Sequence, residues 1–84
     1  MTAVYEDEAV RSRVLEFLLR YVDDPAELEG MQLITGGVLS SLATVALISH
    51  LEKEFGIEVD DDDLELENFD TLDSIVQFVR GKRP

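Results

Sequence analysis

The chain has 84 residues, 45% of them hydrophobic, and its 19 acidic against 7 basic residues give a formal net charge of −12. A chain of this size builds one modest core, which argues against a large enzyme with an enclosed pocket. It contains no cysteine, so a disulfide framework, a zinc ribbon and a thiol nucleophile are excluded, and no apolar run is long enough to span a membrane. The negative charge repels nucleic-acid phosphates and anionic lipid, so we expect a soluble, cytoplasmic protein whose partners are proteins with basic surfaces.

The first predicted element is a helix over residues 7–21. Its apolar residues recur at the spacing of one buried stripe: Val10, Val14, Phe17, Leu18 and Tyr21. The sequence Asp23-Asp24-Pro25 ends this helix, because a residue before proline is driven out of the helical region.

A long loop is predicted for residues 24–39, since they contain one proline and three glycines. Four apolar side chains are expected to pin this loop to the core: Leu28, Met31, Leu33 and Ile34.

A second helix is predicted from Ser41 to Phe55, with Ser40 as its N-cap and Gly56 as its C-cap residue. Apolar residues recur along it at intervals of three and four: Leu42, Val45, Ile48, Leu51 and Phe55. The middle of the chain, from residue 31 to residue 51, contains no acidic residue, whereas both flanking regions are rich in them.

Residues 57–59 are too few for a strand without a partner, so we predict an extended link, followed by a short helical turn near residues 63–68. Thr71 is expected to cap a last helix that buries one face: Leu72, Ile75, Val76 and Val79. Residues 81–84 are expected to form a flexible tail. The prediction is one all-α domain over residues 1–84 with its core in about residues 7–80. It is a small four-helix bundle of three main helices and one short helix, with a long loop between helices one and two.

No catalytic or metal-binding arrangement is predicted. Ser41 and His50 lie on opposite sides of the second helix, about 13.5 Å apart along its axis, so they cannot form a nucleophile and base pair. We therefore interpret His50 as a surface or half-buried helix residue. The acidic run Asp60–Asp63 fits no calcium-binding loop, because neither register supplies the required glycine and final glutamate. A non-catalytic protein without a metal site is expected.

The segment from Gly36 to Ile57 indicates a function. It resembles the modification site of acyl and peptidyl carrier proteins, in which Asp-Ser-Leu begins the second helix and Leu-Glu-x-x-Phe-Gly-Ile ends it. Ser41 and Leu42 occupy the Ser-Leu positions, and the closing motif stands at the matching distance: Leu51, Glu52, Phe55, Gly56 and Ile57. The likeness continues to Asn68-Phe69-Asp70-Thr71 and so covers nearly the whole chain.

The resemblance implies that Ser41 carries a 4′-phosphopantetheine, added from coenzyme A by a phosphopantetheinyl transferase, and that cargo is held on the arm as a thioester. A phosphodiester there would lie at a helix start, where free N–H groups and the helix dipole favour negative charge. Ser40 departs from the family, which usually has Asp at this position. Serine keeps the N-cap function but loses the carboxylate that helps to dock the transferase. This departure leaves three explanations open: modification is slower, it needs a particular transferase, or the site has been altered deliberately. Ser40 also stays a second candidate for attachment.

Three kinds of function stay open. The neutral helix start, with Gly37 four residues before Ser41, resembles freestanding carriers of D-alanyl groups, aminoacyl groups or unusual polyketide extender units such as methoxymalonate. That resemblance implies polyketide or nonribosomal-type secondary metabolism, including antibiotic biosynthesis. The alternatives are a primary fatty-acid carrier, whose family members place acids on this helix, and an unmodified acidic helical interaction domain.

The expected partners are the transferase, a loading ligase or acyltransferase, and downstream synthase or tailoring enzymes. All of them act in trans on a monomer through weak, transient interfaces. Glu52, Glu54 and the acidic run are expected to steer partners from a distance. The contact surface itself is expected to be largely apolar and close to Ser41: Leu42, Ala43, Val45 and Ala46.

Overall fold

The computed structural model describes residues 7–82, and secondary structure within this range is entirely helical. The α-helices are α1 (Asp7–Leu18), α2 (Ser41–Phe55), α3 (Leu66–Phe69) and α4 (Leu72–Lys82). Two short 3-10 helices, η1 (Pro25–Leu28) and η2 (Asp61–Asp63), lie between them. The predicted all-α bundle, with three main helices, one short helix and a long loop between the first two, is confirmed.

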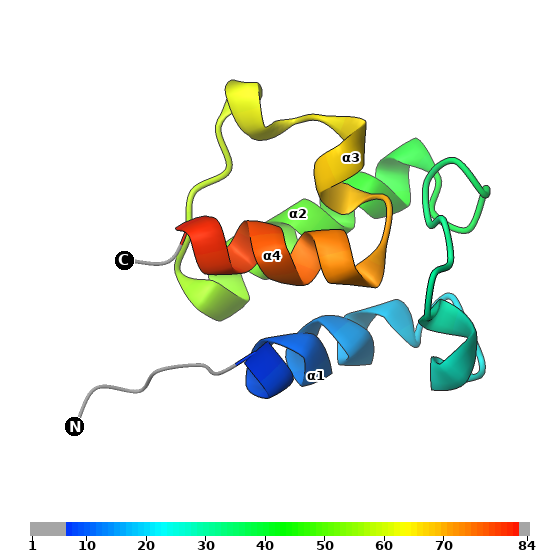
Figure 1. Ribbon diagram of the computed structural model, residues 1–84. Helices are drawn as coiled ribbons and strands as arrows, with labels where there is room; N and C mark the ends of the chain where they lie inside the picture. The colour runs from blue at the N-terminus through cyan, green and yellow to red at the C-terminus, as the bar shows by residue number, and fades with distance from the viewer. Residues whose placement is uncertain (1–6, 83–84) are drawn as a thin grey trace.

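α1 and α4 lie side by side and run in opposite directions, while α2 crosses behind α4 (Figure 1). α1 also contacts α2, and α3 packs on α4. The loop between α1 and α2 passes along one end of the molecule, on the right in Figure 1. Burial of apolar surface is the main force that holds this arrangement. One cluster forms the core: Val10, Val14, Phe17, Leu18, Val22, Leu28, Leu33, Leu39, Ala43, Leu47, Leu51, Phe55, Ile57, Phe69, Leu72, Ile75, Val76 and Val79.

α1 is shorter than predicted. It ends at Leu18, after which the amide of Tyr21 bonds to the Leu18 carbonyl in a tighter, three-residue turn. The tighter turn rotates the chain, so that Val22 is buried at 8% exposure while Tyr21 is 40% exposed. The prediction that Tyr21 belongs to the buried stripe is therefore wrong, and the other four members of that stripe are buried as expected.

α2 begins and ends where predicted, but its core-facing stripe is different from the predicted series. The buried residues recur at every fourth position: Ala43, Leu47, Leu51 and Phe55. Leu42 is 80% exposed and Val45 is 59% exposed. Because apolar residues occur on more than one side of this helix, periodicity predicts the helix but packing against α1 selects the buried side.

α4 matches its prediction closely. Thr71 accepts a hydrogen bond from the Ser74 amide at 3.0 Å, and the predicted face is buried: Leu72, Ile75, Val76 and Val79. The predicted tail, however, begins too early, because Gly81 and Lys82 belong to α4. The Lys82 ammonium lies 2.6 Å from the Asp63 carboxylate, and a cation is also favourable in the last turn of a helix. Residues 83 and 84 of the predicted tail lie outside the described residues.

The long loop is anchored as predicted. Leu28 and Leu33 are fully buried, and Met31 and Ile34 pack partly buried against the core. The sequence prediction missed η1 in this loop, where the Asp24 carboxylate accepts a hydrogen bond from the Ala26 amide at 3.0 Å. The loop therefore has a defined path to the start of α2.

Candidate functional site

Ser40 is the N-cap of α2, as predicted. Its backbone is extended, and its hydroxyl oxygen accepts a hydrogen bond from the Ala43 amide at 3.1 Å. Its carbonyl oxygen accepts bonds from both the amide and the hydroxyl of Thr44, each at 2.9 Å. The side chain of Ser40 is thus engaged in starting the helix.

Ser41 is the first residue of α2, and it is exposed. The amides of Ser41 and Leu42 belong to the first turn, where no preceding turn supplies a carbonyl acceptor. The first turn of α2 contains no acidic residue, and its last turn contains the basic Lys53. A phosphate ester on Ser41 would therefore meet the positive end of the helix dipole without a carboxylate in the same turn. These residues fit a covalent phosphopantetheine.

Two glycines shape the chain just before this serine pair. A Cβ on Gly36 would lie 2.2 Å from the backbone oxygen of Gln32, so only glycine fits the turn. Gly37 has φ +79, which is strained for any residue with a side chain. Both glycines are thus required by the backbone of the turn that leads to Ser40.

Asp70 fastens this part of the loop to the junction between α3 and α4. Its carboxylate oxygen Oδ1 accepts hydrogen bonds from the amides of Ile34 and Thr35, both at 2.9 Å, and Oδ2 accepts one from the Thr35 hydroxyl at 2.8 Å. Its backbone carbonyl accepts a bond from the Leu33 amide at 2.5 Å. The hydrogen bond from the Thr35 amide is the main cause that lowers the pKa of Asp70. Sequence reasoning gave Asp70 no role, because its partners are 35 or more positions away.

Three of the four residues predicted to form an apolar contact surface are exposed, and their contact with partners stays a prediction. Leu42, Val45 and Ala46 are exposed on α2, next to Ser41. Ala43 is buried at 8% exposure, because it lies on the core-facing stripe, so assigning it to the surface was wrong. An open hollow beside the serine pair is lined by Tyr21, Ser40, Leu42, Ala43 and Ala46.

Glu52 does not stand free to steer a partner. It is half-buried, and its carboxylate accepts a hydrogen bond from the Val59 amide at 3.0 Å. It thereby holds the extended link that follows α2. Glu54, also expected to steer, forms an ion pair with Arg13 of α1. Both side chains are engaged within the molecule, and sequence reasoning could not see these partners.

His50 lies half-buried on α2, as interpreted from the sequence. Its ring stacks on Phe17 of α1 with the centroids 4.9 Å apart, and its Nε2 atom is buried without a hydrogen-bond partner. This position joins two helices and does not place the ring beside Ser41 as a base.

The acidic run is also partly neutralised within the molecule. Lys82 lies between Asp60 and Asp63, and the hydrogen bond from Lys82 is the main cause that lowers the pKa of Asp63. Asp61 and Asp62 are exposed. Between residues 7 and 82, no group of three His, Cys, Asp or Glu side chains is arranged to hold a metal ion, and no helix is long and apolar enough to cross a membrane.

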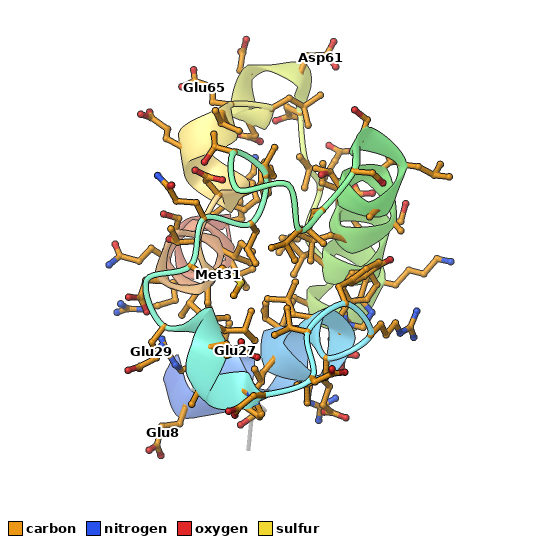
Figure 2. All side chains as sticks on the ribbon, turned by 90° about the vertical axis from the view of Figure 1, so that its right-hand side faces the viewer. Glu8, Glu27, Glu29, Met31, Asp61 and Glu65 are labelled. Atoms are coloured by element: carbon orange, nitrogen blue, oxygen red, sulfur yellow. The ribbon has the colours of Figure 1, made fainter. Side chains whose placement is uncertain are left out.

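Acidic side chains gather at two opposite ends of the face that carries the loop (Figure 2). In this view Glu27 and Glu29 lie at the lower end and Asp61 and Glu65 at the upper end, while Glu8 lies farther back, at the start of α1. Met31 lies between the two groups. The charge therefore flanks the loop, while the start of α2 stays free of acidic residues.

Comparison with known proteins connects this geometry to a family. Residues 37–79 match the family described as "Phosphopantetheine attachment site", and this segment covers about half of the chain. D-alanyl carrier proteins from Streptococcus pyogenes serotype M5 (strain Manfredo) and serotype M49 (strain NZ131) are each 35% identical to the chain over 72 residues. These matches cover 84% of this chain and 91% of each relative. The chain therefore belongs to the phosphopantetheine-binding carrier proteins, which bear 4′-phosphopantetheine covalently and work with phosphopantetheinyl transferases and with ligases or acyltransferases.

Proposed function

We propose that Ser41 bears the 4′-phosphopantetheine, and that the protein holds a small acyl or aminoacyl group as a thioester on this arm for delivery to separate enzymes. The observation that carries the proposal is the different use of two neighbouring hydroxyls. Ser40 is bonded to the Ala43 amide as the N-cap, whereas Ser41 is exposed at the first residue of α2. Ser41 also falls within the segment that matches the family.

Attachment at Ser41 is a phosphoryl transfer from coenzyme A. The Ser41 oxygen bonds to the phosphorus next to the pantetheine group, and the P–O bond to the second phosphate breaks. Adenosine 3′,5′-bisphosphate leaves with that electron pair, and the serine proton passes to a base of the transferase. This chain contributes an accessible hydroxyl and a helix start that stabilises the negative phosphodiester.

The test of the site is the intact mass of the protein after incubation with coenzyme A, Mg²⁺ and a broad-specificity transferase. We expect one phosphopantetheinyl addition on the natural chain and on Ser40→Ala, and none on Ser41→Ala. Ser40→Asp keeps the N-cap and restores the residue usual in the family, so it should be modified faster than the natural chain. Full modification of Ser41→Ala would move the site to Ser40. No modification of any variant would favour the unmodified acidic interaction domain.

The cargo is best supported as a small acyl or aminoacyl group. The relatives are named D-alanyl carrier proteins, which favours an aminoacyl cargo. The first turn of α2 lacks the acidic residues that fatty-acid carriers place on this helix, which argues against that alternative. A polyketide extender unit such as methoxymalonate is the second candidate, favoured by the apolar sequence from Leu42 to Ile48.

The cargo can be identified on protein purified from its own cells. Mass spectrometry of the modified Ser41 peptide, before and after thioester cleavage with hydroxylamine, gives the mass of the bound group. An amino acid or a short polar acid is expected. A long alkyl chain would make the protein a fatty-acid carrier.

We also propose that partners contact the exposed apolar residues beside Ser41, with charge acting only at long range. Leu42, Val45 and Ala46 are exposed there, and the exposed acids Asp61 and Asp62 lie on η2. Raising salt from low to physiological concentration should therefore change KM for the transferase only modestly. A change of orders of magnitude would show that charge dominates the interface.

A further inference from the structure

We infer that Asp70 is a positioning residue for the modification of Ser41, because it fixes the loop segment that leads into the start of α2. The inference rests on the proposed function of Ser41 and adds a residue that lies outside the serine pair. Three hydrogen bonds to its carboxylate and one to its carbonyl converge on Leu33, Ile34 and Thr35.

These bonds act on a turn that has few other ways to satisfy its amides. Residues 33–36 form a tight turn in which the Gly36 amide bonds to the Gln32 carbonyl at 3.0 Å. The amides of Leu33, Ile34 and Thr35 precede that bond and all donate to Asp70. Asp70 thus caps the turn from a distant part of the chain, as an N-cap residue does for a helix.

The turn is connected directly to the serine pair. The Leu39 amide donates to the Leu33 carbonyl at 2.7 Å, and Ser40 is the next residue. Leu33 and Leu39 are both buried, at 0% and 2% exposure. The path from the Asp70 carboxylate to the N-cap therefore starts with the hydrogen bond that the Ile34 amide donates to it and crosses the peptide group that Ile34 shares with Leu33. It continues through the hydrogen bond from the Leu39 amide to the Leu33 carbonyl and ends with one peptide bond to Ser40.

Burial alone would not give the same result. Apolar contacts hold Leu33 and Leu39 in the core but have little directional preference. Hydrogen bonds to a carboxylate are directional and are strengthened by its charge. The lowered pKa of Asp70 agrees with this arrangement, since these bonds favour the charged form. A loop with a fixed orientation presents Ser41 in the geometry that a transferase binds, and a released loop does so only part of the time.

The test compares Asp70→Ala and Asp70→Asn with Asp73→Asn in the transferase reaction. The asparagine oxygen can still accept from the two amides, so we expect graded effects: KM rises by roughly tenfold in Asp70→Ala and by less in Asp70→Asn, with kcat unchanged. Asp73 is the matched control, because it is a carboxylate three residues away that crosses to Arg11 of α1 and not to the loop. Its removal should change KM by less than about twofold.

Amide hydrogen exchange on the unmodified variants gives a second readout. In Asp70→Ala the amides of Ile34, Thr35 and Leu39 should exchange faster, while those of Leu47 and Leu51 in α2 stay protected. Equal KM in Asp70→Ala and Asp73→Asn would overturn the inference, and so would unchanged exchange in the loop. A uniform loss of protection would show that Asp70 only supports overall stability, which also overturns the inference.

If the natural chain accepts no phosphopantetheine, the proposed function fails and the inference about modification fails with it. If the natural chain is modified and the Asp70 variants behave like the control, only the inference fails.

Discussion

α2 and α4 are both helices with apolar residues on one side, but they use those residues differently. α4 buries its predicted apolar face, and the exposed positions of that helix are mainly polar. α2 buries a stripe that includes the small Ala43 and leaves the larger Leu42 and Val45 in solvent, beside Ser41. The comparison shows that α4 serves the core, and it supports the proposal that the start of α2 keeps apolar surface for contact with other proteins.

The largest expected effect is a difference in the free energy of unfolding between substitutions on the buried side and on the exposed side of α2. Leu47→Ala should lower the free energy of unfolding by about 2 to 5 kcal/mol, because Leu47 is fully buried and its removal leaves a cavity. Leu42→Ala should change it by less than about 0.5 kcal/mol, since that side chain is 80% exposed. Urea unfolding followed by circular dichroism measures both. If Leu47→Ala does not fold, Ile75→Val in α4, with an expected loss of about 0.5 to 1.5 kcal/mol, keeps the comparison measurable. Equal losses at Leu42 and Leu47 would contradict the assignment of the buried stripe.

Three glycine substitutions test the turn before α2 against the end of α4. Gly36→Ala should destabilise by about 1 to 3 kcal/mol, because its Cβ would overlap the Gln32 carbonyl. Gly37→Ala should cost about 1 kcal/mol, because its φ is positive. Gly81→Ala should stabilise by a few tenths up to about 1 kcal/mol, since it is helical with no atom near the added Cβ. Thermal unfolding gives this order, and a stabilising Gly36→Ala would show that the turn has another conformation.

A charge on the exposed side of α2 should affect function and leave the fold intact. Leu42→Asp is expected to raise KM for the transferase about tenfold, equivalent to about 1.4 kcal/mol, because a carboxylate would be buried at an apolar contact. Gln77→Asp adds the same charge at an exposed position of α4 and serves as the control. Steady-state kinetics with unmodified protein, together with the Tm of each variant, separate contact from stability. Similar KM values for the two variants would contradict a partner surface at Leu42.

The smallest expected effect concerns pH. The pKa values of Asp63 and Asp70 lie below the ordinary 3.8, so their contributions are complete above that pH and are lost as the pH falls through the lower folded values. The pKa of Lys82 is raised above 10.5 by its bond to Asp63, so its contribution is complete below pH 10.5 and is lost at higher pH. Lys82→Gln should therefore weaken the dependence of Tm on pH at both extremes, and Asp70→Asn only at the acid extreme. An unchanged acid profile in both variants would show that neither contact contributes to stability.

Local patterns identified most of the helices because the relevant forces act within one segment. Thr71 and Ser40 are capping residues that act on amides three residues ahead, and both caps are present. The apolar residues of α4 recur at helical spacing on one side, so only that side can be buried. Prediction failed at Tyr21, because the chain leaves α1 in a tighter local turn that exposes this side chain.

In the candidate site too, the local features could be predicted and the long-range contacts could not. The exposed serine at the start of a capped helix could be predicted from about ten consecutive residues. The engagement of Glu52 by Val59, the pairing of Lys82 with the acidic run, and the contacts of Asp70 with the loop could not. These contacts join residues that are between 7 and 37 positions apart, and a single sequence does not indicate such pairs.

The sequence by itself determined the long helices except for the end of α1, the caps of α2 and α4, and the placement of a serine at the start of α2, because each depends on neighbouring residues. The tertiary structure decided which stripe of α2 is buried, which acids are free to meet a partner, and what holds the loop before Ser41. The physical reason is that burial and hydrogen bonding at these positions depend on α1, α4 and the α3–α4 junction, which reach them only when the chain is folded.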